Sequence, residues 1–165
     1  MTDAILAANG EHTTNGVPKY ASVLAPHVVV SPAKSALTFY QDVFGAKMLS
    51  VIESGDVVVH ADLRFNGAGV TLSDPLDAYE LKAPEGQGSV TYSLALYVSD
   101  MDDVVERAVR AGATLREPVS TFVSGDRYGS LLDPFGVRWA VMTRVEDLSA
   151  EESERRVKEW SASLG

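Results

Sequence analysis

The chain has 165 residues, of which 45% are hydrophobic and 22% are charged, and it carries a net charge of −9 without any cysteine. This length and composition predict one globular domain, and the acidic balance disfavours nucleic acid as a partner because phosphate binding needs a concentrated basic surface. The lack of cysteine excludes disulfides and thiolate metal sites and fits a cytoplasmic protein. No apolar run reaches the length of about 18 residues needed for a membrane span, and no signal peptide is visible, so we expect no membrane partner.

The first half of the chain predicts an arm followed by one βαβββ module. Residues 1–19 are polar and without period, which predicts a flexible N-terminal arm. The β-branched run 23–30 predicts a strand, and apolar residues at helical spacing predict a helix over 33–44, capped by Ser31 and closed by Gly45. Three further strands are expected at 47–54, 57–65 and 69–73.

The second half repeats this order after a connecting loop at 76–89. We expect a strand at 90–98, a helix at 100–111, and strands at 114–122, 128–132 and 137–142. The tripeptides FGA at 44–46 and AGA at 111–113 lie 67 residues apart, as do Gly69 and Gly136, which indicates an internal duplication. The sequence therefore predicts a single domain, 20–147, built from modules 20–75 and 90–147.

The turn Asp133-Pro134-Phe135-Gly136 predicts a hairpin, because Pro presets φ, Asp can bond forward, and Gly accepts a left-handed conformation. In the strand that follows, Val137, Trp139 and Val141 alternate with Arg138, Ala140 and Met142, and we interpret Trp139, with Phe39 and Phe44, as core. Residues 148–165 predict a C-terminal helix with a capping box at Ser149 and Glu152. Its apolar stripe Val157, Trp160 and Leu164 is expected to dock on the domain or on a second subunit.

Several stretches together resemble the glyoxalase/bleomycin-resistance (vicinal oxygen chelate) superfamily, and within it the PhnB-like branch. They are SALTFYQDVFGAKM, HADLRFNGAGVTLSD, GDRYGSLLDPFGVRW and the EDLSAEE tail. The resemblance implies an α+β fold in which two βαβββ modules form a curled eight-stranded mixed sheet around a cleft, with a C-terminal helix added here. It also implies a homodimer that binds a small molecule.

Period-two alternation sorts the strand residues between the two faces of the sheet. It predicts that Val57, Val59, Ala61, Leu63 and Phe65 lie under the helices and that His60, Asp62 and Arg64 lie on the opposite face. The ligand-binding cleft is then predicted to contain His27, His60, Ser73, Thr91, Ser93 and Arg138. Arg138 is the expected partner of an anionic ligand group, because its planar guanidinium matches a carboxylate or phosphate.

The metal enzymes of the superfamily imply four ligand positions, which fall near His27, Ser73, Thr91 and Ala140. Only His27 can serve as an ordinary ligand, whereas divalent sites normally need three or four donors. We therefore expect no metal or other cofactor and favour a metal-independent module that binds, and so sequesters, a small molecule, with no catalytic residue assigned. The alternative is a metal-dependent lyase, isomerase or dioxygenase that holds one divalent ion through His27, His60 and Asp62.

Overall fold

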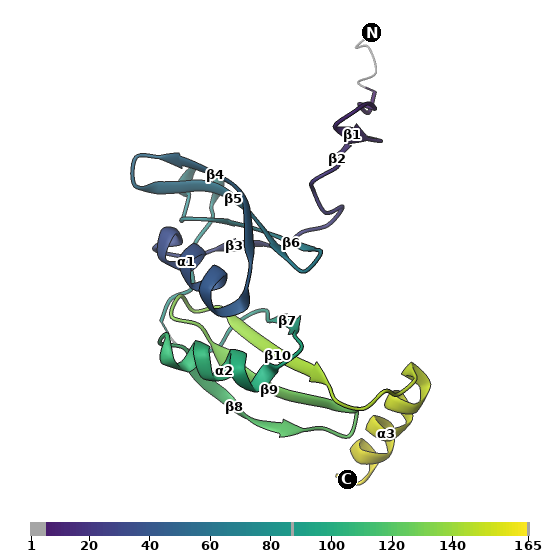
Figure 1. Ribbon diagram of the computed structural model, residues 1–165. Helices are drawn as coiled ribbons and strands as arrows, with labels where there is room; N and C mark the ends of the chain where they lie inside the picture. Colours follow the sequence, from purple (N-terminus) through teal and green to yellow (C-terminus); the bar gives the residue numbers. More distant parts are fainter. Residues whose placement is uncertain (1–5, 87, 165) are drawn as a thin grey trace.

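The computed structural model describes residues 6–86 and 88–164, which form two modules of one helix and four strands each (Figure 1). The first module comprises β3 (His27–Val29), α1 (Ala33–Phe44), β4 (Lys47–Ser54), β5 (Val57–Phe65) and β6 (Ala68–Ser73). The second comprises β7 (Leu94–Tyr97), α2 (Met101–Arg110), β8 (Thr114–Thr121), β9 (Asp126–Leu132) and β10 (Arg138–Arg144). Outside the modules lie β1 (Thr13–Thr14), β2 (Val17–Pro18), the 3-10 helix η1 (Asp77–Tyr79) and α3 (Ala150–Ala162).

The two modules have the same sheet topology. Their strand orders are β3-β6-β5-β4 and β7-β10-β9-β8, with β3 and β7 parallel to their neighbours and the other pairs antiparallel. The α+β class, the duplicated βαβββ order and the C-terminal helix are thus confirmed. The eight strands divide into two four-stranded sheets, and within the described ranges no strand pairing joins one sheet to the other.

The helix ends follow from local chemistry. Gly45 ends α1 in the left-handed conformation, with φ of 69°, and the Asp100 side chain caps α2 by accepting from the N–H of Asp103 at 3.1 Å. The cap expected from Ser31 is wrong, because Pro32 precedes the helix and offers no side-chain acceptor. Instead Asp74, which follows β6, accepts from the N–H of Ala33 at 3.0 Å and ties the helix to its own sheet.

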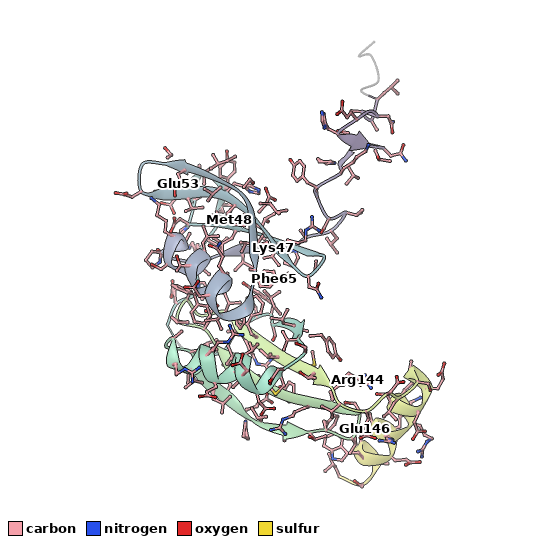
Figure 2. The ribbon with its side chains drawn as sticks, viewed as in Figure 1. Lys47, Met48, Glu53, Phe65, Arg144 and Glu146 are labelled. Carbon is pink, nitrogen blue, oxygen red and sulfur yellow. The ribbon has the colours of Figure 1, made fainter. Side chains whose placement is uncertain are left out.

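Aromatic rings from both modules meet in one shared core. They are Phe39, Tyr40 and Phe44 from α1, Phe65 from β5, and Phe135 and Trp139 from the β9–β10 hairpin. The ring centroids of Phe44 and Trp139 lie 4.5 Å apart. Figure 2 shows Phe65 at the junction of the modules. The interpretation of Trp139, Phe39 and Phe44 as core is confirmed, and the two modules are held together mainly by this packing.

The first strand of each module is shorter than predicted. The strand expected at 90–98 covers only Leu94–Tyr97, because its partner β10 begins at Arg138 and leaves residues 90–92 without a strand to pair with. In the first module β3 starts at His27, directly after Pro26, which has no N–H to donate to a ladder. Thr91, predicted on a strand, therefore lies in the loop that joins the modules.

A β-bulge changes the face assignment at the start of β5. The register pairs Ile52 with His60 and Glu53 with Val58, which makes Val59 an extra residue. Val58 is fully buried as a result, whereas Val57 is 40% exposed. The predicted apolar row is therefore right at its buried members Ala61, Leu63 and Phe65 and wrong at Val57 and Val59.

The C-terminal helix α3 docks on its own chain, at the turn between β8 and β9. The Trp160 ring meets Phe122 edge-on at 4.8 Å, and the Ser153 hydroxyl donates to the Ser124 carbonyl at 2.9 Å. Glu146, labelled beside α3 in Figure 2, accepts from Arg156 at 2.9 Å. Of the predicted apolar stripe, Trp160 thus contacts the domain, whereas Leu164 is 68% exposed.

Residues 6–19 extend away from both modules (Figure 1). Within them β1 and β2 pair as a small antiparallel ladder. Arg64 ties the following segment to β5, since its guanidinium donates to the Tyr20 carbonyl and to the Gly67 carbonyl. Among the described residues no helix is both long and apolar enough to cross a membrane.

Candidate functional site

His27 stands on the face of the first sheet that α1 leaves open, and both of its ring nitrogens are engaged. Nδ1 lies 2.8 Å from the Thr71 hydroxyl, and Nε2 lies 3.1 Å from the Ser73 hydroxyl. Because Ser73 donates its own proton to the Asp74 carbonyl at 2.8 Å, the arrangement favours Nε2–H as the donor to Ser73 and Nδ1 as the acceptor from Thr71. These two contacts fix the orientation of the imidazole, and its lowered pKa keeps the ring neutral at pH 7.

His60 lies beside His27 on the same face. The two rings are stacked at 6.3 Å with an interplanar angle of 10°. The Nε2 atom of His60 is 3.2 Å from a carboxylate oxygen of Asp62, and Ser50 donates to that same oxygen at 2.6 Å. The predicted cluster of His27, His60 and Ser73 is therefore a real juxtaposition on this face.

Titration of His27 should reveal this environment. Partial burial, followed by repulsion from His60, lowers the pKa of His27 below 6.5. Between the folded-state pKa and pH 6.5, His27 binds a proton in the unfolded chain but not in the folded chain. The contribution of neutral His27 to the free energy of unfolding is therefore complete above pH 6.5 and is lost as the pH falls through the folded-state pKa. An NMR titration of the His27 ring should give a midpoint below 6.5, raised by His60→Gln. A wild-type midpoint at or above 6.5 would contradict the assignment.

On the open face of the second sheet, Arg138 and Glu117 organise a polar cluster. Arg138 donates to Glu117 at 2.6 Å and to the Ser93 hydroxyl at 2.7 Å. Tyr128 and Ser130 donate to the same oxygen of Glu117, Ser130 at 2.5 Å. These hydroxyl hydrogen bonds, with Arg138 nearby, lower the pKa of Glu117. Glu117 is therefore ionised and forms an ion pair with Arg138.

A cavity of about 310 Å³ connects these two polar clusters. Its walls are His27 and Val29 from β3, the joining segment with Lys82, Thr91 and Tyr92, and Arg138 at the start of β10. Three of the six predicted cleft residues, His27, Thr91 and Arg138, line it directly. Of the others, Ser73 and His60 contact His27, and Ser93 contacts Arg138.

Sequence reasoning missed five residues of this region: Lys82, Tyr92, Glu117, Tyr128 and Ser130. Tyr128 and Ser130 lie on β9 at the same period-two face as Arg138, so alternation could have found them. Glu117 could not be found in this way, because the register of β8 shifts between Leu115 and Glu117 and places Glu117 opposite Ser130. The two loop residues carry no periodic signal.

The strand register also revises one inferred ligand position. Val29 pairs with Ser73 and Ala95 pairs with Ala140, so the counterpart of His27 in the second module is Ser93, two residues before Ala95, rather than Thr91. The four positions thus carry His27, Ser73, Ser93 and Ala140. This donor set does not fit a divalent ion, and in the described ranges no three His, Asp or Glu side chains are grouped to hold one, His27, His60 and Asp62 included.

Comparisons with known proteins agree with this architecture. Residues 20–141 match the family described as Glyoxalase/Bleomycin resistance protein/Dioxygenase superfamily. A protein of Mycobacterium bovis is 35% identical over 133 residues, which cover 78% of this chain and 88% of that protein. The PhnB protein of Bacillus cereus has a TM-score of 0.59 at 17% identity, with 74% of this chain and 99% of that chain covered. FosX of Listeria monocytogenes, a fosfomycin resistance protein solved with Mn(II) and sulfate, has a TM-score of 0.60 at 12% identity, with 83% and 98% covered.

Proposed function

Since the chain belongs to the glyoxalase/bleomycin resistance/dioxygenase superfamily, we propose that it is a PhnB-like module that binds a small molecule in the cavity between its two sheets, without a metal ion. The observation that carries this proposal is the cavity wall itself. Polar side chains that lie far apart in sequence, His27 and Arg138, meet there around apolar Val29 and the Tyr92 ring. A mostly small-sided concavity with a few fixed polar groups is the usual constitution of a ligand site.

The electrostatics of the cavity favour ligands with a hydrogen-bond-accepting or acidic group. Lys82 and Arg138 both line the wall, and Glu85 is the only carboxylate among its described lining residues. His27 adds a neutral imidazole whose orientation is fixed by Thr71 and Ser73. Two cationic side chains can therefore converge on one accepting group, while the imidazole ring and Tyr92 offer flat surfaces to the rest of the molecule.

A fragment screen tests the proposal. Isotope-labelled protein should be titrated with a fragment library whose members are cationic, anionic, zwitterionic or neutral, each at up to 5 mM. Binding should shift the amide resonances of Val29, Thr91, Tyr92 and Arg138 together. Failure of every class to bind, or shifts confined to another surface, would refute a ligand site in this cavity.

The protein should be purified with well under one equivalent of Zn, Ni, Mn or Fe, and chelator should leave its melting temperature unchanged. The reason is chemical: Ser73, Ser93 and Ala140 occupy three of the four ligand positions, and Nδ1 of His27 is occupied by Thr71. Elemental analysis of untagged protein measures the content. Stoichiometric metal that is lost in His60→Ala would overturn the proposal and support a metal-dependent enzyme instead.

We further propose that the chain forms a homodimer. The edge strand β4 exposes Met48, Leu49, Val51 and Ile52 by 37–58%, and Figure 2 shows Met48 and its neighbour Lys47 on this strand. An apolar edge strand with free backbone groups needs a cover, and a second copy supplies one in a superfamily whose members often dimerise. Sedimentation velocity at micromolar concentration should give twice the 17.7 kDa of one chain, and a single 17.7 kDa species would contradict the dimer.

A further inference from the structure

A second cavity adjoins the first and is lined by a different carboxylate, that of Glu117. It measures about 370 Å³ and is lined by Glu117, Ser130, Leu132 and Arg116 on one side and by Ser89 and Val90 on the other. Ser89, Val90 and Arg138 line both cavities. The two cavities are therefore neighbouring parts of one groove, with Arg138 at their junction.

Glu117 is built into the wall of this second cavity as a fixed anion. Tyr128, Ser130 and Arg138 all donate to Oε2, and Ser130 is fully buried. In the described part of the chain, no hydrogen bond is recorded to the other oxygen, Oε1. Three donors hold the carboxylate in place and keep it ionised, which leaves Oε1 available to a group in the cavity.

The charges that line the groove have both signs. Lys82 and Glu85 line the first cavity, Arg116 and Glu117 line the second, and the Arg138–Glu117 ion pair lies where the two cavities meet. A simple anion at Arg138 would lie close to Glu117 and be repelled by it. A molecule with an additional protonated amine would turn that repulsion into a second ion pair.

We propose that the groove selects a zwitterionic small molecule, with its acidic group between Arg138 and Lys82 and its protonated amine on Oε1 of Glu117. This inference rests on the proposed small-molecule site and names the class of ligand it takes. Glu117 acts in it as a specificity-determining residue, and it also orients Arg138.

The test compares the affinities of the wild type and of Glu117→Gln for each ligand class. The probes are phenylalanine as the zwitterion, 3-phenylpropylamine as the cation and 3-phenylpropionate as the anion, which share a phenyl group. The four-class fragment library is screened beside them. Glutamine keeps an oxygen acceptor for Tyr128 and Ser130 but removes the charge. In the wild type, zwitterions should bind most tightly. In Glu117→Gln they should bind about ten- to a hundredfold more weakly, the usual effect of losing a charge-assisted contact, while carboxylates bind more tightly.

Glu106→Gln is the matched control, because Glu106 also pairs with an arginine, Arg110, but on the exposed surface of α2. It should leave every affinity unchanged. Wild-type binding with no preference for zwitterions, or the same ranking of classes in Glu117→Gln, would refute the inference while leaving the ligand site intact. Failure of all classes to bind would instead refute the proposed function itself.

Discussion

Replacement of Asp133 with alanine is expected to lower the free energy of unfolding by about 3 to 5 kcal/mol, which is about 10 °C in melting temperature for a chain of this size. Asp133 is fully buried in the β9–β10 turn. Its carboxylate accepts from the Tyr40 hydroxyl at 2.7 Å, from the Trp139 ring N–H at 3.0 Å, and from the N–H groups of Phe135 and Val137 at 2.9 Å each. Alanine would leave four donors without this acceptor in the shared core.

Chemical denaturation followed by Trp fluorescence would measure this loss. Tyr40→Phe removes only one of the four donors and should cost about 1 kcal/mol. Asp147→Ala, at an exposed position with no recorded partner in the described part of the chain, should cost nearly nothing. A loss below 1 kcal/mol in Asp133→Ala would show that the turn, α1 and Trp139 are not coupled through this carboxylate.

Arg138→Met should weaken binding of any carboxylate-bearing fragment in the groove about ten- to a hundredfold. Methionine retains an apolar stem of similar length but removes the cation that lines both cavities. Loss of one charge-assisted hydrogen bond typically costs about 1.5 to 3 kcal/mol, which corresponds to this range of affinity.

Calorimetric titration of the wild type and the variant, both shown to be fully folded, would measure the effect of Arg138→Met on the affinity. Arg110→Met is the matched control, since Arg110 forms an ion pair with Glu106 on the outer face of α2, away from the groove. Equal affinities in the two variants would mean that the carboxylate binds elsewhere than at Arg138, and the ligand orientation proposed for the groove would be wrong.

The features that sequence reasoning predicted well are those with local chemistry. Gly45 marks the end of α1, and the Asp133 turn marks the hairpin. Each depends on backbone conformation or on hydrogen bonds within a few residues, so the residue type alone carries the information.

The features it missed depend on residues far apart in the chain. The bulges in β4–β5 and β8–β9 move Val58 into the core and bring Glu117 opposite Ser130, and alternation within one strand does not reveal a register shift. Asp74 caps a helix 41 residues earlier, which only the folded sheet brings about. Arg138 was correctly placed on a polar face, yet its counter-ion remained hidden for the same reason.

The absence of strand pairing between the two described sheets has a consequence for how this groove can change. In a continuous sheet, the backbone ladder would set the distance between neighbouring walls to a fixed strand spacing. Here the walls bearing His27 and Arg138 are spaced by the volume of rings such as Phe39, Phe135 and Trp139. Exchange of one ring for a smaller or larger side chain would resize the groove without breaking a strand. Substitutions in the core can therefore change ligand specificity as readily as substitutions of the residues that line the groove.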